Sequence, residues 1–174
     1  MGYSTKIQSE GANDINMSDV VKKIGECDIE WIQQELENKK VSAQFPLQGA
    51  FEGDFDGAVG KTYDLRADES AYTVPLYDDM PYTYSLLEKY GMFRTRAMKM
   101  IKGTCYSYHI DLTPRIHIPL TSNERCMFII DDKVYKLPAD GSVYLVDTTL
   151  YHTALNANRE QFIRTHIVGN VKAQ

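Results

Sequence analysis

The feature that most constrains the fold is a change of hydrophobic period after Met92. From Phe93 to Ile101 apolar and polar residues roughly alternate, which is typical of a β-strand because successive side chains point to opposite faces. Turn residues at Asp131-Asp132, Ala139-Asp140-Gly141 and Asn156-Ala157-Asn158 separate the short segments that follow. The further strands expected are 105–109, 115–120, 126–130, 134–137, 142–146, 152–155 and 162–168. About eight short strands at this spacing predict a mainly β double-sheet barrel or jelly roll, with its core at about residues 92–170.

The N-terminal half contributes fewer recognisable elements. Residues 1–16 are polar and aperiodic and predict a flexible tail, and residues 17–174 are expected to form a single domain. Residues 20–24 predict an edge strand. Asp28 is expected to cap a helix that runs through Lys39.

A second helix is expected over residues 81–90, ended by Gly91, and both helices are expected to pack on one sheet. Residues 45–65 look like a loop. Its segment 51–57 superficially resembles a calcium loop but lacks the third acidic position and the terminal Glu, so a flexible acidic turn is the preferred interpretation.

Charge and composition exclude several classes of function. The net charge of -5 and pI near 5.4 give no indication of nucleic-acid binding. The apolar runs fall short of the roughly 20 residues that span a bilayer, so no membrane association is expected. There is no secretory apolar region after Met1. Three cysteines without metal-type spacing predict reduced, mostly buried thiols in a cytoplasmic protein: Cys27, Cys105 and Cys126.

Three side chains suggest a metal site. His109 ends a predicted strand and Asp111 follows two residues on, so the two can face the same point if the strand geometry continues, and His152 begins a later strand. Two imidazoles and one carboxylate form the facial triad suited to Fe(II), because three coordination positions stay open. A closed zinc site would need another Cys or His at short spacing. His-x-Asp alone is a weak signal, and the alternative is a turn histidine beside a capping aspartate.

Arg164 is the second candidate residue, because it interrupts an otherwise apolar strand. A buried arginine is normally paired, and its planar fork suits the distal carboxylate of a dicarboxylate such as 2-oxoglutarate. His166 lies two residues on and shares its face. The alternatives are an outward-facing arginine on a half-solvated strand, or Arg159 as the anchor in its place.

The motifs of this region resemble a known family when they are taken in order. They are HIDLTPRIHIPL (109–120), DGSVYLVDTT (140–149) and HTALN (152–156). Together they resemble the aspartyl/asparaginyl β-hydroxylases, a group of Fe(II)- and 2-oxoglutarate-dependent oxygenases that also includes free-proline hydroxylases. The resemblance covers roughly residues 94–168 and implies a double-stranded β-helix, or cupin-like fold.

The resemblance also implies roles for individual residues. His109, Asp111 and His152 match the iron ligands, and Arg164 looks like the arginine that holds 2-oxoglutarate. Three further residues are expected around the cosubstrate or substrate: Arg115, His117 and Met98. His166 is expected beside them because it shares the face of Arg164, not because of the resemblance. The alternative for His117 is a satisfied core histidine, and for Met98 it is core packing. Asp111 departs from the animal aspartyl hydroxylases, which have glycine there, and agrees with the proline hydroxylases.

The activity implied is hydroxylation of an unactivated C–H bond of an amino acid or amino-acid residue. Fe(II), 2-oxoglutarate and O2 are the expected cofactor and cosubstrates, and succinate and CO2 the by-products. The substrate is a small molecule or a residue on a partner protein. The alternative function is a non-catalytic cupin-like barrel that binds a metal or a dicarboxylate.

Overall fold

The computed structural model describes residues 20–57, 59 and 68–172, and these form a mainly β structure with two α-helices. The expected tail, residues 1–16, lies outside the described residues. The helices are α1 (Ile29–Glu37) and α2 (Pro81–Lys89), with a short 3-10 helix, η1, at Glu69–Ala71. The strands are β1 (Val21–Glu26), β2 (Gln44–Pro46), β3 (Gln48–Gly49), β4 (Val74–Pro75), β5 (Phe93–Met100), β6 (Thr104–Cys105), β7 (Arg115–Thr121), β8 (Cys126–Ile130), β9 (Lys133–Tyr135), β10 (Ser142–Val146), β11 (His152–Asn156) and β12 (Arg164–Asn170).

The largest sheet has six antiparallel strands in the order β1-β10-β7-β12-β5-β2. Its centre is β12, which pairs with β5 on one side and β7 on the other, with Ile167 opposite Ala97 and Ile118. Because β1 pairs with β10 alone, it lies at the edge of this sheet, as the sequence predicted.

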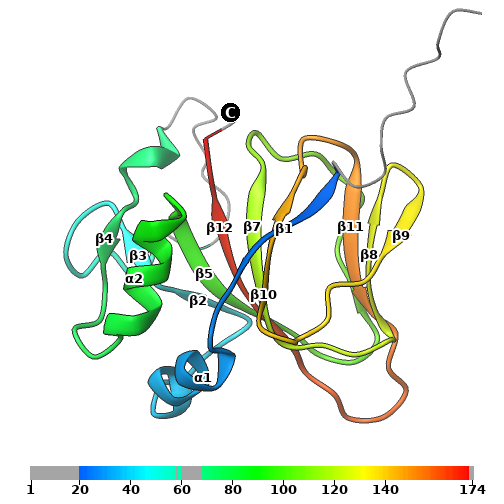
Figure 1. Cartoon of the computed structure of the whole chain (residues 1–174), viewed down its shortest axis with the longest axis horizontal. Helices are drawn as coiled ribbons and strands as arrows, with labels where there is room; N and C mark the ends of the chain where they lie inside the picture. The colour runs from blue at the N-terminus through cyan, green and yellow to red at the C-terminus, as the bar shows by residue number, and fades with distance from the viewer. Residues whose placement is uncertain (1–19, 58, 60–67, 173–174) are drawn as a thin grey trace, which may run out of the picture.

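A second sheet has the order β6-β11-β8-β9 and faces the first. Figure 1 shows this sheet and the two helices on opposite sides of the six-stranded sheet. The two sheets do not join into a closed barrel over the part of the chain that is described. A two-stranded pair, β3 and β4, completes the strand pairing.

Alternation along the central strands produces two apolar layers. Ile116 and Ile118 of β7 and Ile167 of β12 face the helices, where they pack with Ile32 of α1 and Leu87 of α2. The opposite face contributes to a smaller cluster between the sheets, made of Met100, Phe128, Ile130, Leu137, Val146 and Ala154. The arginines of β5, β7 and β12 and His117 lie on this second, inner face.

The helix starts follow from local chemistry. Asp28 is the N-cap of α1, and its carboxylate accepts a bond from the backbone N–H of Trp31 at 3.1 Å, as predicted. In α2, Pro81 occupies the first turn, where its missing N–H costs nothing. Glu35 of α1 accepts from the backbone N–H groups of Tyr82 and Thr83, which ties the two helices together.

Some predictions are wrong in detail. The stretch 45–65 is not all loop, since β2 and β3 fall partly or wholly in it. The strand expected at 105–109 ends at Cys105. In the segment that resembles a calcium loop, Asp54 accepts bonds from the backbone N–H groups of Ala50 and Gly57, so this carboxylate closes a turn. Of the cysteines, all free, only Cys126 is fully buried, and Cys105 is exposed.

No helix in the described ranges is long and apolar enough to cross a membrane.

The position of Ile167 at the centre of the core gives a stability prediction. Ile167→Ala removes a fully buried side chain between the central sheet and the helices. It should lower the free energy of unfolding by about 2–5 kcal/mol, measured by urea denaturation. Ile163→Ala, at a half-exposed position just before β12, should change it by less than about 1 kcal/mol. Equal losses in the two variants would contradict this placement of the core.

Candidate metal centre

A backbone pair brings the two candidate histidines together. His109 lies in the loop after β6, and His152 begins β11. The N–H of His109 donates to the carbonyl of His152 at 3.0 Å, and the N–H of His152 donates back to His109 at 2.8 Å. This isolated antiparallel bridge places the two ring centroids 4.5 Å apart. Residues separated by 43 positions in the sequence therefore face the same point.

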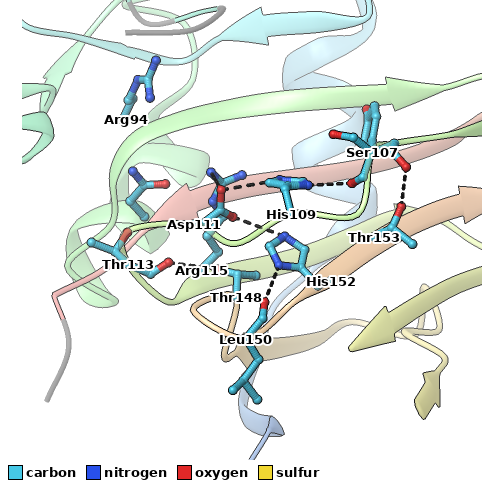
Figure 2. Close-up of polar contacts among 12 residues, drawn as sticks. Arg94, Ser107, His109, Asp111, Thr113, Arg115, Thr148, Leu150, His152 and Thr153 are labelled. Carbon is cyan, nitrogen blue, oxygen red and sulfur yellow. Dashed lines mark hydrogen bonds and ion pairs between the residues drawn. The ribbon is translucent and has the colours of Figure 1, made fainter. Parts of the chain in front are cut away.

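Both imidazole rings are oriented by carbonyl groups two residues earlier. The Nδ1 of His109 lies 2.7 Å from the carbonyl oxygen of Ser107, and the Nδ1 of His152 lies 2.9 Å from that of Leu150. A carbonyl accepts only, so each Nδ1 carries the proton and each Nε2 keeps its lone pair. Figure 2 shows both rings directed at Asp111. This is the arrangement in which a neutral histidine binds a metal through Nε2.

Asp111 completes the group. Its Oδ1 lies 3.6 Å from Nε2 of His109, and its Oδ2 lies 3.4 Å from Nε2 of His152. The backbone N–H of Asp111 donates to the carbonyl of Thr148, which holds the loop against the start of β11. Arg115 donates from Nη2 to Oδ1 at 2.7 Å. Oδ2 is buried and accepts no hydrogen bond from the described residues.

The electrostatic surroundings keep Asp111 ionised. Burial opposes ionisation and is the largest influence, but His152, when its Nε2 carries a proton in place of a metal, and the positive charge of Arg115 outweigh it. Their sum lowers the pKa of the Asp111 carboxyl below its ordinary value. The carboxylate is therefore the acceptor-only form that a metal requires.

These three residues fit a divalent metal ion. One ligand atom from each lies within 4.8 Å of the other two. Two ligands at right angles on a metal are about 3 Å apart, so the observed separations need only a small contraction. The buried Oδ2 without a donor and the two free lone pairs of the imidazoles supply the ligands. Two nitrogens and one oxygen on one side leave the remaining positions open to solvent or substrate.

The three residues open into a cavity of about 590 Å³ between the two sheets. Its walls are the inner face of β5, β7 and β12, the start of β11, and the loop from Tyr106 to Thr113. Two apolar residues of that loop, Ile110 and Leu112, line the cavity and are more than half exposed, so they lie at its mouth. A volume of this size suits a small organic ligand.

Arg164 lies in the same cavity, at the start of β12. It is 4% exposed, and Nη2 donates to Nδ1 of His166 at 3.1 Å. Burial lowers the pKa of Arg164 to about 10, against the opposing influence of Cys126 and Tyr106, so it stays charged near neutral pH. No carboxylate in the described part of the chain pairs with it. Arg159, in contrast, is exposed and does not line the cavity.

The other predicted residues differ in their access to the cavity. His117 lines the cavity and is fully buried, and neither ring nitrogen has a hydrogen-bond partner among the described residues. Burial, then Arg164, holds its pKa well below the ordinary value, so the ring is neutral. Met98 is partly buried and lines the cavity. His166 is fully buried behind Arg164 and does not line it, and burial likewise keeps its pKa low.

Two arginines of this cavity were not predicted from the sequence, Arg94 and Arg96. Both are 5% exposed and lie on β5 with Met98, at alternate positions of the inner face. Arg94 pairs with Glu69 of η1, and Nη1 of Arg96 donates to Oε1 of Gln44 at 3.1 Å. The signal that identifies them is the spacing 94, 96, 98 within one strand, once Met98 is assigned to the cavity.

Comparison with known proteins adds one match. A family model described as Aspartyl/Asparaginyl beta-hydroxylase matches residues 26–172. This span includes α1, α2 and every strand from β2 to β12, so it extends far beyond the residues 94–168 expected to carry the resemblance. A search of curated proteins finds no match.

The geometry predicts metal-dependent stability. Anaerobic Fe(II) at about 100-fold above its dissociation constant should raise the melting temperature by roughly 5–10 °C, because it binds only the folded chain. His109→Ala, Asp111→Ala and His152→Ala should each abolish the rise. Glu37→Ala, at an exposed acid at the end of α1 and outside the cavity, is the control and should retain it. A rise that survives His152→Ala would place the metal elsewhere.

Proposed function

The chain belongs to the aspartyl/asparaginyl β-hydroxylase family, and we propose that it is an Fe(II)- and 2-oxoglutarate-dependent dioxygenase. The reaction proposed is hydroxylation of an unactivated C–H bond in an amino acid or amino-acid residue. The observation that carries the proposal is the convergence of His109, Asp111 and His152 in one cavity with the guanidinium of Arg164, which pairs with no carboxylate of the described residues. A metal triad and a fixed cation are what a chelating dicarboxylate needs.

In this proposal Nε2 of His109, Nε2 of His152 and a carboxylate oxygen of Asp111 hold Fe(II). Bound iron, 2-oxoglutarate and O2 together supply the oxidising power, with succinate and CO2 released. The chain's own contribution is to prepare the ligands. Backbone carbonyls hold the imidazole protons at Nδ1, and Arg115 holds one oxygen of Asp111, so that the facing atoms need no proton loss or rotation.

Arg164 is proposed to bind the distal carboxylate of 2-oxoglutarate. It is nearly inaccessible to water, and an arginine fork binds a carboxylate bidentately. His166 accepts one Nη2 hydrogen and so fixes the plane of the guanidinium from behind. His117 and Met98 line the same wall, where a neutral imidazole with unpaired nitrogens can bind either carboxylate end or the substrate.

The fold supports this assignment. The two facing antiparallel sheets fit a double-stranded β-helix, or jelly roll, with its core at about 92–170. We propose that residues 17–174 form one oxygenase domain, and the family match over residues 26–172 supports this. The helices pack only on the outer face of the large sheet. The inner face therefore remains available for polar side chains and ligands.

Succinate formation tests the proposed reaction. The Fe(II)-loaded protein should release succinate from 2-oxoglutarate in air, with uptake of O2. His109→Ala and His152→Ala should each reduce the rate by more than about 100-fold, because one ligand is lost from the metal. Unchanged turnover in both variants would contradict the assignment. Binding of 2-oxoglutarate without any O2 uptake would instead favour the non-catalytic barrel.

The anchor for 2-oxoglutarate is tested by a matched pair of arginines. Arg164→Gln should raise the KM for 2-oxoglutarate by about 30-fold or more, because it removes one partner of a buried charge pair. Arg159→Gln makes the same charge change at an exposed position and should leave the KM unchanged within about 2-fold. The reverse result would make Arg159 the anchor.

A further inference from the structure

The candidate metal ligand His152 and the candidate anchor Arg164 lie on different sheets. His152 begins β11 of the four-stranded sheet, whereas Arg164 begins β12 of the six-stranded sheet (Figure 1). No strand pairing joins these two sheets within the ranges that are described. A dicarboxylate that binds a metal at one end and a guanidinium at the other therefore needs a spacing that side chains maintain.

Phe128 contacts both sides of this gap. It lies on β8 of the four-stranded sheet, is 5% exposed and lines the cavity. Its ring stacks on the imidazole of His152, with the centroids 5.7 Å apart and the planes 11° from parallel. The same ring meets the imidazole of His117, on β7 of the six-stranded sheet, at 5.2 Å and 79°. One rigid ring thus lies between a candidate metal ligand and the opposite wall of the cavity.

The contacts continue from His117 to the anchor. Neither ring nitrogen of His117 has a hydrogen-bond partner among the described residues, so packing against neighbouring rings orients it. One neighbour is Phe128, and the other is His166, whose ring centroid lies 5.7 Å away at 79°. The Nδ1 of His166 in turn accepts from Nη2 of Arg164 at 3.1 Å. Because buried side chains are close-packed, displacing Phe128 shifts this series as far as the guanidinium.

The two ends of the gap are fixed in different ways. Asn156, at the end of β11, donates from Nδ2 to the carbonyl of Met100 at 2.9 Å, and Met100 pairs with Arg164. A hydrogen bond therefore joins the two sheets beside the anchor. His152 lies at the other end of β11, where the ring of Phe128 reaches across to β7. The spacing at the metal end is set by this aromatic packing.

We propose that Phe128 is a positioning residue that sets the span between the metal and Arg164, and thereby the length of the 2-oxo dicarboxylate that the site accepts. The inference rests on the proposed function, which assigns the metal to His152 and the distal carboxylate to Arg164. Phe128 acts through His152 on one side and through His117 on the other. A dicarboxylate one methylene longer or shorter does not reach both ends in their fixed positions.

Binding without turnover tests this proposal separately from the reaction. The Zn(II)-loaded protein is titrated calorimetrically with 2-oxoglutarate, with oxaloacetate, which is one methylene shorter, and with 2-oxoadipate, which is one methylene longer. The wild type should bind 2-oxoglutarate at least about 10-fold more tightly than either of the others. Phe128→Leu should weaken 2-oxoglutarate binding by about 10-fold, because the ring contacts that fix the span are lost, and should change the other two by less than about 3-fold.

A matched variant separates positioning from general packing. Leu137 belongs to the same cluster between the sheets as Phe128, but it does not line the cavity. Leu137→Ala should lower the melting temperature and keep the preference for 2-oxoglutarate. The visible spectrum of the Co(II)-loaded protein, which depends on ligand geometry, should change in Phe128→Leu and stay as in the wild type in Leu137→Ala. If Phe128→Leu does not fold, Phe128→Met fills a similar volume without a rigid ring and should show the same losses.

Several outcomes would overturn the proposal. They are a wild type that binds none of the three acids or binds them equally, an unchanged affinity for 2-oxoglutarate or an unchanged Co(II) spectrum in Phe128→Leu, and an equal loss of preference in Leu137→Ala. Tighter binding of 2-oxoadipate to Phe128→Leu, with 2-oxoglutarate unaffected, would mean that the ring only limits space. An Fe(II)-loaded wild type that forms no succinate would overturn the proposed reaction and leave the length preference standing.

Discussion

The proposed site depends on one short-range interaction, the reciprocal backbone hydrogen bonds between His109 and His152. Neither residue lies in a long strand at this point, and β6 has already ended at Cys105. The bridge, with the bonds that join Tyr106 to Thr153 and Ala154, holds the loop that follows β6 against the start of β11. The hydrogen bond from each Nδ1 to a backbone carbonyl then orients both rings. The backbone N–H of Asp111 bonds to the carbonyl of Thr148, which positions Asp111 beside them.

The second organising constraint is positive charge inside the molecule. The inner faces of β5, β7 and β12 carry arginines where a β-sandwich normally packs apolar side chains. Two of them are neutralised by Glu69 and Asp111, and the cost of the other two is balanced by the apolar layer on the outer face, centred on Ile167. The outer face of the six-stranded sheet thus forms the stable apolar core, while its inner face lines the polar cavity.

Sequence patterns predicted the bounds of strands better than they predicted which side chains touch. The bounds of β8 and β10 agree with those expected from alternation and turn residues, whereas β2 and β3 are too short to show a period. Spacing grouped His109 with Asp111, but it gave no indication that Arg115 bonds to Asp111 or that Arg94 and Arg96 face the cavity. Which face of a strand turns inward is decided by packing with distant segments, here the helices. The roles assigned to the site residues stay predictions, and the family match covers far more of the chain than its motifs suggested.

The central claim is that one metal ion and one dicarboxylate occupy adjacent places in this cavity. Anomalous diffraction at the iron edge, from crystals grown without oxygen in Fe(II) and 2-oxoglutarate, measures both positions at once. We expect a single iron peak between His109, Asp111 and His152, with the far end of 2-oxoglutarate bound to Arg164. Iron bound at other residues, or a dicarboxylate that does not contact Arg164, would contradict it.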